Sequence, residues 1–569
     1  MRARAYHDFA GSLDLRSGSR QKPCVSQVAG HYSFPFECGC SSVVEHLLAK
    51  EDVASSSLVT RSPVRGEQKA KPMSNLTIVP SRQSFSELAK QGNVVPVYVD
   101  FVADGETPAS AFQKLDNGGH SFLFESAEQT EQSGRYSFLG FSPRLIIRSE
   151  NGGVSLEENG RIATMAVSAD PLTALERTMS RFRFVAEPDL PRFAGGAVGF
   201  LGYDVVRSFE KSVPPPPEDD LKLPEMIFMI MGLLVVFDHR YRRVKIVANV
   251  FLDDHENAAA AHAAAERRIH EALAKLASPA RLPLIDAQKP VTRQAMRSNT
   301  TQEKFETAVL KAKEHIRAGD AFQIVLSQRF ETDFAGDPLK LYRCLRLVNP
   351  SPYMFCLRFG DSFSLVGSSP ELHVRVTDDV AEVRPIAGTR RRARTAEEDA
   401  RNAAELLADP KERAEHVMLI DLARNDLGRV AETGTVRVTE QMVIERYSHV
   451  MHIGSHVVAR LRKDKTAYDV MRATFPAGTV SGAPKIRAMQ IISQLETKKR
   501  GCYAGAVGYF GFDGALDCCI ALRSIVLKDG RAYLQAGAGI VADSDPTSEY
   551  QETVNKAMAM VDAISRANE

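Results

Sequence analysis

The chain has 569 residues, of which 44% are hydrophobic and 25% are charged. This composition is typical of a folded globular protein, and the length allows about two to four domains or one large enzyme core. Lysine and arginine number 72 against 71 aspartates and glutamates, which gives a formal net charge of +1. The charge balance argues against a protein that holds nucleic acid or an anionic membrane by electrostatics.

The longest apolar run, Met226 to Phe237, is shorter than the ~20 residues that cross a bilayer, so it predicts a buried strand. The sequence indicates no transmembrane segment. The eight cysteines are scattered, and no Cys-x2-Cys pair recurs at the spacing of a zinc site. We therefore expect a protein of the reducing cytoplasm without structural zinc.

Residues 1–72 differ from the rest because they have little periodicity, two serine-rich patches and three of the eight cysteines. Acidic residues throughout the segment argue against a mitochondrial presequence. Met73 begins a stretch that could be an alternative start. We expect residues 1–72 to be disordered or to lie outside the native protein.

Residues 73–282 form the first predicted region, which is rich in strands. Short alternating or apolar runs predict these strands, at Val95–Val102, Ser121–Phe124, Tyr136–Leu139, Leu145–Ile147 and Met226–Phe237. The proline-rich and acidic stretch 212–223 predicts a surface loop. The alanine-rich stretch 257–277 predicts a helix. Residues 283–300 then form a predicted linker.

Residues 301–569 form the second predicted region. We expect a helix at 302–318, a long helical stretch at 395–429, a mostly stranded last part and a terminal helix at 546–566. Strands are predicted between the first two helices, at 321–330, 353–359, 364–368 and 372–376. One segment echoes another: Gly196-Ala-Val-Gly-Phe-Leu-Gly-Tyr-Asp204 resembles Gly505-Ala-Val-Gly-Tyr-Phe-Gly-Phe-Asp513. Such glycines allow close approach of a ligand or of another strand, and both readings stay open.

Two segments share one pattern, in which an Asp-Pro pair begins a helix and two glutamates follow three residues apart. The residues are Asp409, Pro410, Glu412 and Glu415 in one segment, and Asp545, Pro546, Glu549 and Glu552 in the other. Each glutamate pair falls on one helical face. Two such faces turned toward each other would suit a hard cation, and Mg²⁺ above others. The alternative is that the glutamates serve only as helix caps and dipole partners.

Other candidates carry less chemistry. The glycine-rich stretches 478–485 and 537–542 fit no nucleotide fingerprint, but their backbone N–H groups could bind a carboxylate. Arg390, Arg391, Arg392 and Arg394 form a basic cluster that suits an anionic small molecule or a solvated loop. His449 faces away from His452 and His456 in a strand, so a three-histidine metal site is disfavoured. No cysteine or serine occupies a nucleophile turn of an amidase.

At this point long motifs match a family. Four stretches in fixed order resemble the chorismate-utilising enzymes, specifically the anthranilate synthase component I family: Arg384-Pro-Ile-Ala-Gly-Thr-Arg390, Lys411-Glu-Arg-Ala-Glu-His-Val-Met-Leu-Ile-Asp-Leu-Ala-Arg-Asn-Asp-Leu-Gly428, Phe475-Pro-Ala-Gly-Thr-Val-Ser-Gly-Ala-Pro-Lys485 and Ala536-Gly-Ala-Gly-Ile-Val541. The resemblance covers about Ser74 to the C-terminus. It implies an α/β (α+β) fold in which two large, mainly antiparallel sheets pack as a sandwich with helices outside.

The resemblance also implies a site. Glu415 and Glu552 match the Mg²⁺ ligands, with Glu412 and Glu549 behind them. The residues that match chorismate contacts are Gly388, Thr389, Tyr503, Arg523, Gly537, Ala538 and Gly539. Arg523 has the planar fork that binds a carboxylate bidentately.

The implied reaction adds ammonia to the ring of chorismate with loss of the ring hydroxyl, and then eliminates pyruvate to leave anthranilate. Hydroxide is a poor leaving group, so a general acid is needed, and Glu371 matches the acid of the family. Burial or neighbouring carboxylates must keep it protonated near neutral pH. His452 matches the histidine of the elimination step.

Two positions separate this chain from its relatives. Ala387 stands where aminodeoxychorismate synthases typically carry a nucleophilic lysine, and Gln323 stands where isochorismate and salicylate synthases carry the lysine that activates water. An amide cannot act as that base, so ammonia is the implied nucleophile. The chain lacks a glutaminase cysteine, so a separate glutamine amidotransferase subunit is implied, in a hetero-oligomer.

Feedback inhibition by tryptophan, the end product of the pathway whose first committed step this would be, is implied as well. Phe122-Leu-Phe-Glu-Ser126 and Asn349-Pro-Ser-Pro-Tyr-Met354 resemble the two tryptophan-binding segments, with Ser126, Pro352, Tyr353 and Met354 as contacts. One alternative is aminodeoxychorismate synthase component I, which Ala387 and the intact tryptophan segments disfavour. Another is a non-catalytic tryptophan-sensing scaffold, which the retained glutamates and Arg523 disfavour.

Overall fold

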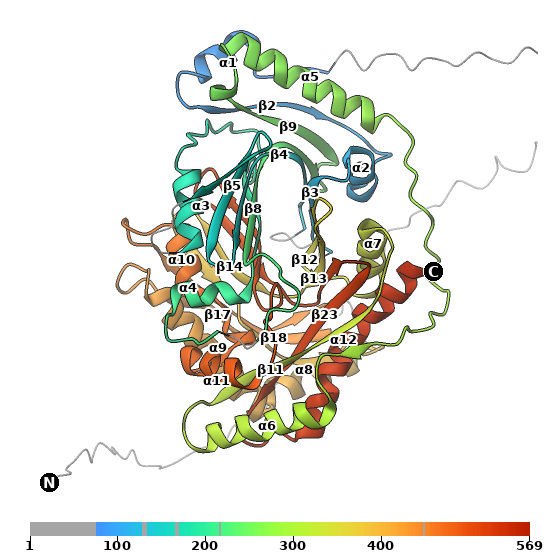
Figure 1. Ribbon diagram of the computed structural model, residues 1–569, viewed down its shortest axis with the longest axis vertical. Coiled ribbons are helices and arrows are strands. Elements are labelled where there is room, and N and C mark those ends of the chain that lie inside the picture. Colours follow the sequence, from blue (N-terminus) through green and yellow to red (C-terminus); the bar gives the residue numbers. More distant parts are fainter. Residues whose placement is uncertain (1–75, 128–133, 166–169, 216–217, 448–449) are drawn as a thin grey trace, which may run out of the picture. The chain divides into compact units, whose positions relative to one another are not determined.

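The computed structural model describes residues 76–127, 134–165, 170–215, 218–447 and 450–569. The expectation for residues 1–72 and the position of His449 lie outside this set. Everything below belongs to the compact unit Pro72–Glu569. Helices and antiparallel strands alternate throughout it (Figure 1), so the predicted mixed class of fold is confirmed.

The first region is rich in strands, as predicted. Its strands are β1 (Ile78–Val79), β2 (Val94–Phe101), β3 (His120–Glu125), β4 (Tyr136–Glu150), β5 (Gly153–Glu158), β6 (Arg161–Met165), β7 (Gly196–Leu201), β8 (Met226–Asp238) and β9 (Arg243–Phe251). Its helices are α1 (Arg82–Leu88), α2 (Pro108–Leu115), α3 (Pro171–Met179), α4 (Val206–Phe209) and α5 (Ala258–Leu276). The two strands predicted at 136–139 and 145–147 are one strand, β4, with a bulge between Pro143 and Leu145.

The apolar run is the buried strand β8, as predicted. Within the part of the chain that the structure describes, no helix is long and apolar enough to cross a membrane. Residues 283–296 contain neither helix nor strand.

The second region contains the remaining elements. Its strands are β10 (Arg297–Ser298), β11 (Gln323–Asp333), β12 (Tyr353–Phe359), β13 (Ser364–Ser369), β14 (Leu372–Thr377), β15 (Val380–Val383), β16 (Ile386–Arg391), β17 (Arg437–Arg446), β18 (Val450–Arg460), β19 (Gly482–Ala483), β20 (Ala506–Gly511), β21 (Leu516–Ile520), β22 (Ser524–Lys528) and β23 (Arg531–Ile540). Its helices are α6 (Gln302–Arg317), α7 (Pro338–Val348), α8 (Ala396–Ala408), α9 (Pro410–Gly428), α10 (Ala467–Thr474), α11 (Lys485–Leu495) and α12 (Pro546–Asn568).

The helical stretch predicted at 395–429 is two helices rather than one. α8 ends at Ala408, and α9 begins at Pro410, because proline cannot continue a preceding helix but suits a first helical position. Asp409 caps α9 by accepting from the backbone N–H groups of Lys411 and Glu412, at 3.0 and 3.3 Å. The last part of the chain also contains α10 and α11, where mostly strand was expected.

Antiparallel ladders join the strands of the two regions. β3 pairs with β12, and β7 pairs with β20. One hydrophobic cluster draws its described members from strands and loops alone, including Phe200, Met229 and Phe355, so it lies between facing layers of sheet. Two further clusters include buried side chains of α5 and α12, and of α9 and α10, against the outer faces. In Figure 1, α5 lies along β9 and α12 runs beside β23.

The two echoed glycine segments are the paired strands β7 and β20. Gly199 lies opposite Gly508, and Gly196 lies opposite Gly511. A Cβ added at Gly199 would lie 1.8 Å from the carbonyl oxygen of Ile227, and one at Gly508 would lie 2.0 Å from that of Asp517. The glycines therefore allow strands to pack closely, and of the two readings that stayed open the packing role is the one the structure supports.

Candidate active site

Glu371 lies in the turn between β13 and β14, and only 5% of the residue is exposed. Its carboxyl group accepts a hydrogen bond from the hydroxyl of Thr479 at 2.6 Å. Burial raises the pKa of Glu371 to about 8, although the bond from Thr479 and the charge of Arg523 act in the opposite direction. At neutral pH this carboxyl group is protonated, as a general acid must be.

Arg523 lies in the turn before β22, with a left-handed backbone at φ +48°. Its Nη1 is 3.5 Å from Oδ1 of Asn349. Burial lowers its pKa, while the charge of Glu371 acts to raise it. Within the described residues no carboxylate lies at ion-pair distance from this guanidinium, so its fork is free to bind an anionic ligand near the acid.

His452 is a buried residue of β18, beside the Gly388-Thr389 turn of β16. Its Nδ1 is 2.8 Å from the carbonyl oxygen of Gly388 and 3.1 Å from the hydroxyl of Thr389. A carbonyl accepts only, so Nδ1 carries the proton and Nε2 has a free lone pair. Burial lowers the pKa of His452, which keeps the ring neutral and able to accept a proton.

The first glutamate pair lies at the start of α9. Glu415 accepts a hydrogen bond from the side-chain amide of Gln323 on β11, at 3.0 Å. Burial and the charge of Glu415 raise the pKa of Glu412. Gly388 lies directly against this turn, because a Cβ there would be 3.0 Å from Oε2 of Glu412. The first pair is therefore adjacent to the turn that contacts His452.

The second pair lies at the start of α12, where Asp545 caps the helix. Burial raises the pKa of Glu549. The hydrogen bond with Ser544 lowers this pKa, and the charge of Glu552 raises it. Glu552 is more exposed, and it pairs with Lys556 at 2.6 Å. Lys411 of α9 acts electrostatically on Glu549, so the two helix starts are near each other.

The glycine stretch of β23 connects the two pairs. A Cβ at Gly539 would lie 2.6 Å from Nε2 of Gln323, the amide that bonds Glu415. The carbonyl of Gly537 accepts from Lys556 at 3.1 Å, the lysine that pairs with Glu552. The partners of both glutamates thus contact one short segment, with Ala538 between the two glycines. Among the described residues, however, no three His, Cys, Asp or Glu side chains are gathered closely enough to hold a metal by themselves.

Tyr503, in the loop before β20, contacts the same segment. A Cβ at Gly537 would be 2.7 Å from its hydroxyl oxygen, so only glycine allows the tyrosine to lie there. The tyrosine is buried, which raises its pKa to about 12 and leaves the hydroxyl as a neutral donor. The residues proposed to contact substrate therefore form two groups, one around Glu371, Arg523 and His452, and one along β23.

Some residues singled out from the sequence have other partners. Lys485 is bonded to Asp426 at 2.6 Å and to the carbonyl of Thr474, so its ammonium group is satisfied within the protein. Arg390 pairs with Asp409 at 3.1 Å and with Glu412. The glycine-rich stretch 478–485 contributes to the candidate site through Thr479, which is bonded to Glu371.

Two partners of the candidate site were not found from the sequence. Thr479 holds Glu371, and Asn349 is within reach of Arg523. Thr479 lies in one of the four recognised motifs, and Asn349 lies in a predicted tryptophan segment. Their position in known motifs could therefore have marked them as site residues. Their contacts could not be found in this way, because these join chain segments far apart in sequence.

The two predicted tryptophan segments are neighbours. Glu125 of β3 pairs in register with Met354 of β12, and the N–H of Ala127 donates to the carbonyl of Ser351 at 3.1 Å. Ser126 and Pro352 therefore lie next to each other at the end of this ladder. The Tyr353 hydroxyl donates to Asp517 at 3.3 Å on the other side.

Known proteins resemble this chain in sequence and in fold. Residues 119–562 match the chorismate binding enzyme family. The chain is 47% identical to anthranilate synthase component 1 of Acetivibrio thermocellus over 86% of its own length and 99% of that protein. The corresponding protein of Aquifex aeolicus is 46% identical, over 86% of this chain and 98% of that protein.

The crystal structure of anthranilate synthase component I from Streptococcus pneumoniae TIGR4 superposes with a TM-score of 0.67 at 41% identity. The superposition covers 76% of this chain and 93% of that chain. Sequence and fold agree over most of both proteins. This chain therefore belongs to the anthranilate synthase component I family of chorismate binding enzymes.

Proposed function

We propose that the protein is the large subunit of anthranilate synthase, which converts chorismate and ammonia to anthranilate, pyruvate and water, the first committed step of tryptophan biosynthesis. One observation carries the proposal: Glu371, whose pKa burial raises to about 8, lies near a guanidinium that has no carboxylate partner among the described residues. A neutral acid and a free cation side by side suit a substrate that has both a carboxylate to bind and a hydroxyl to lose.

In the first step ammonia forms a bond to the ring and the ring hydroxyl leaves. Glu371 donates its proton to that hydroxyl, so that water departs rather than hydroxide. Thr479 fixes the carboxyl group through its 2.6 Å bond. Arg523 binds one carboxylate of chorismate, and Tyr503 and the backbone of Gly537 to Gly539 line the ring.

In the second step a ring proton is removed and the enolpyruvyl C–O bond breaks, which releases pyruvate. The free lone pair on Nε2 of His452 supports its assignment as the base, because the carbonyl of Gly388 fixes the proton on Nδ1. The neutral ring that burial favours is the form that accepts a proton.

We further propose that Glu415 and Glu552 hold Mg²⁺, with Glu412 and Glu549 behind them. Gln323 and Lys556, the partners of Glu415 and Glu552, both contact the same glycine stretch of β23, which supports the convergence of the two glutamates. Mg²⁺ takes oxygen ligands and needs only one or two protein carboxylates beside water and substrate oxygens. The donor set therefore fits. When bound, the ion would neutralise a carboxylate of chorismate.

The nucleophile we propose is ammonia. Ala387 is buried and has no amine, and the amide of Gln323 donates to Glu415 rather than acting on water. A glutamine amidotransferase subunit would supply the ammonia, in a hetero-oligomer. Tryptophan would bind between β3 and β12 and inhibit the reaction. The five described cysteines are free thiols, which supports a cytoplasmic location.

The test is incubation with chorismate, Mg²⁺ and ammonium at alkaline pH, where more of the ammonium is free ammonia. Anthranilate is followed by its fluorescence, and pyruvate is measured in the same sample. We expect the two products in equal amounts. Formation of an aminated chorismate without pyruvate, or no turnover at all, would refute the proposed reaction.

A further inference from the structure

Arg500 lies between α11 and β20, is 3% exposed, and binds three different segments. Its Nη2 and Nε donate to the two carboxylate oxygens of Glu496, at 2.6 and 2.8 Å. Its Nη1 donates to the carbonyl of Val480 at 2.8 Å, and Nη2 also donates to that of Val325 at 2.7 Å. A planar guanidinium can hold three acceptors at fixed angles, and a lysine cannot.

Two of these partners are one or two residues from the candidate site. Val480 directly follows Thr479, which holds Glu371. Val325 lies two residues from Gln323 on β11. Glu496 also accepts from the N–H and the hydroxyl of Ser327, both at 2.8 Å. The guanidinium therefore fastens the turn behind the acid to the strand that contacts the carboxylates.

The rings beside Arg500 extend the same connection. Its guanidinium carbon lies 4.6 Å from the ring centre of Tyr203 and 5.7 Å from that of Tyr503. Tyr503 lies three residues further along the chain and lines the glycine stretch of β23. A displacement of Arg500 would move this tyrosine together with Thr479.

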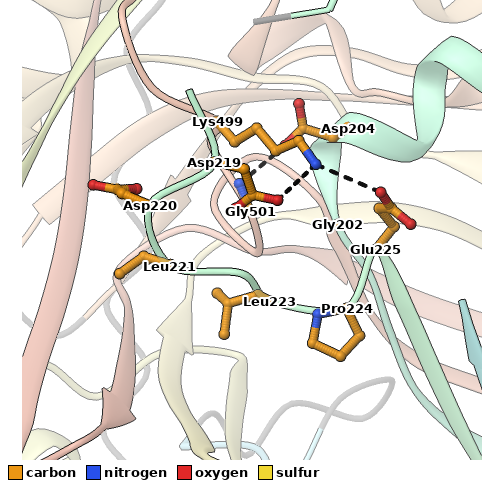
Figure 2. Close-up of a pocket in the computed structure, with 10 residues that line it drawn as sticks. All are labelled: Gly202, Asp204, Asp219, Asp220, Leu221, Leu223, Pro224, Glu225, Lys499 and Gly501. Carbon is orange, nitrogen blue, oxygen red and sulfur yellow. Dashed lines mark hydrogen bonds and ion pairs between the residues drawn. The ribbon is translucent and has the colours of Figure 1, made fainter. Parts of the chain in front are cut away.

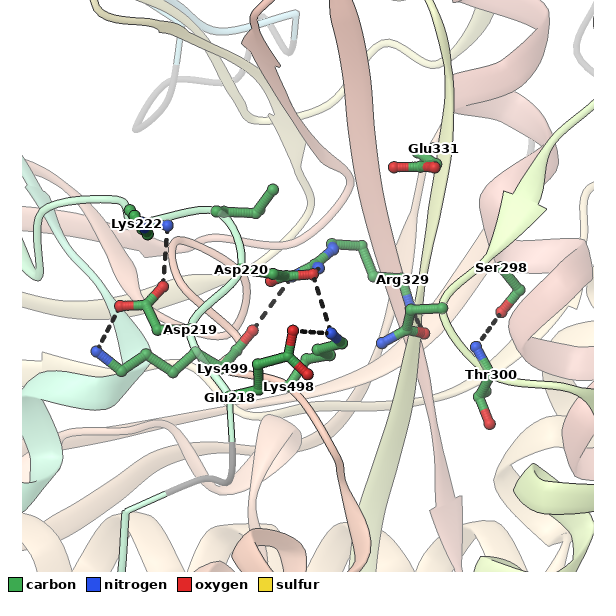
Figure 3. A network of polar contacts seen from close by, with 12 residues as sticks. Glu218, Asp219, Asp220, Lys222, Ser298, Thr300, Arg329, Glu331, Lys498 and Lys499 are labelled. Carbon is green, nitrogen blue, oxygen red and sulfur yellow. Dashed lines mark hydrogen bonds and ion pairs between the residues drawn. The ribbon is translucent and has the colours of Figure 1, made fainter.

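Two lysines next to Arg500, Lys498 and Lys499, hold the same loop through ion pairs of their own. Lys499 pairs with Asp219 and Glu225, at 2.8 and 3.6 Å (Figure 2). Lys498 pairs with Glu218 and Asp220 at the protein surface (Figure 3). The Lys498 pairs are partly exposed to solvent and contribute little, whereas the guanidinium of Arg500 is buried and is hydrogen-bonded to three segments.

We infer that Arg500 is a positioning residue for the proposed reaction, which places Thr479 behind the acid and Tyr503 beside the substrate through one buried guanidinium. The inference rests on the proposed function. It assigns to Arg500 both an effect on chorismate binding, through Tyr503, and an effect on proton transfer, through Thr479.

The test compares Arg500→Lys with Lys498→Met, a change in the same loop that removes only a surface pair. For each folded variant, kcat and the KM for chorismate are measured with saturating ammonia and Mg²⁺, at a temperature well below its thermal midpoint. We expect Arg500→Lys to raise KM and lower kcat, with a combined loss of about 100-fold in kcat/KM. Lys498→Met should match the wild type.

A merely structural role would reduce the active fraction, which lowers apparent kcat and leaves KM unchanged. An unchanged KM in Arg500→Lys would therefore overturn the inference. A double-mutant cycle with Thr479→Val sharpens the result, because the two losses in kcat should be less than additive if Arg500 acts through Thr479. Fully additive losses would refute that route.

If Arg500→Lys does not fold, Glu496→Gln tests the same clamp, because it weakens the guanidinium's ion pair and keeps both carbonyl bonds. The expected sign is again a raised KM, and an unchanged KM overturns the inference. Failure of the wild type to make anthranilate would refute the proposed function instead, so the two failures are distinguishable.

Discussion

The acid pocket around Glu371 and the glutamates at the starts of α9 and α12 use the same side chain in opposite ways. Glu371 is 5% exposed and its pKa is raised to about 8, so the fold alone sets its protonation. The side chain of Glu552 is 47% exposed and is paired with Lys556. Glu371 has its contacts within the protein, whereas the carboxylate of Glu552 is open to solvent.

This difference predicts that Glu371 responds to pH and that the glutamate pairs respond to the concentration of Mg²⁺. Burial favours the neutral carboxyl, whereas a cation favours the ionised one. The acid should therefore depend on pH and on its protein neighbours. The glutamate pairs should depend on the concentration of Mg²⁺. Five experiments can break or sharpen this contrast.

The largest effect is expected at the glutamate pairs. Glu415→Gln and Glu552→Gln should each abolish turnover at ordinary Mg²⁺ concentrations, because an amide oxygen is a weaker ligand than a carboxylate. Mg²⁺ titrations of anthranilate formation measure this, with the exposed Glu398→Gln of α8 as the matched control. Wild-type Mg²⁺ dependence in either variant would show that the metal is bound elsewhere.

Glu371→Gln should lower kcat by about 10²- to 10⁴-fold, because the amide cannot protonate the leaving hydroxyl. In the wild type, kcat at saturating ammonia should fall as pH rises through about 8, where the acid loses its proton. The variant should lack this decrease. A pH profile of kcat for both proteins is the measurement, and a wild-type decrease retained by the variant would contradict the assignment.

The stability of the same variant gives an independent check. The pKa of Glu371 is higher in the folded state than the ~4.3 of an unfolded glutamate, so its contribution to stability is full below that value and is lost as pH rises to about 8. Glutamine does not titrate. The thermal midpoint of Glu371→Gln relative to the wild type should therefore be higher at pH 9 than at pH 5.

Arg523→Met should have a smaller effect that falls mainly on binding. Loss of charged hydrogen bonds to a carboxylate costs about 1.5 to 3 kcal/mol, which corresponds to about 10- to 150-fold in the KM for chorismate. The guanidinium lacks a protein carboxylate among the described residues, so its removal should not lower the thermal midpoint. A lower midpoint with an unchanged KM would indicate a structural arginine.

Ser126→Phe should have the smallest effect on catalysis. The residue lies beside Pro352 at the end of the β3–β12 ladder, in the proposed tryptophan site. We expect the larger ring to relieve inhibition by tryptophan while ammonia-dependent activity stays at the wild-type level. Curves of activity against tryptophan concentration test this. Unchanged inhibition would show that tryptophan does not bind at this ladder.

Most of the fold could be predicted from local pattern. Strand β12 begins and ends where its apolar residues predicted, and α5 and α6 end within a residue or two of the prediction. The sequence predicted that a helix begins at Asp409-Pro410. It did not predict that the preceding helix, α8, ends there. α10 and α11 were missed because short buried helices resemble buried strands in apolar content.

The candidate site was predictable where motifs mark it and hidden where tertiary contacts decide. Glu371 and Arg523 came from the resemblance, whereas both glutamate pairs were marked first by the repeated Asp-Pro pattern. The bond from Thr479 to Glu371 joins residues 108 positions apart, and no local pattern encodes it. Lys485 likewise pairs with a distant residue, Asp426. Its ammonium group is therefore bound within the protein rather than available to an anion.

The pairing of β7 with β20 has a consequence for how the polypeptide could be divided. A cut in residues 283–296 would separate the chain where neither helix nor strand crosses the break. Each half would then have to expose a strand that is normally covered, β7 in one and β20 in the other, and bare strand edges promote aggregation. Both fragments would need to be made together, so that each could cover the other's edge.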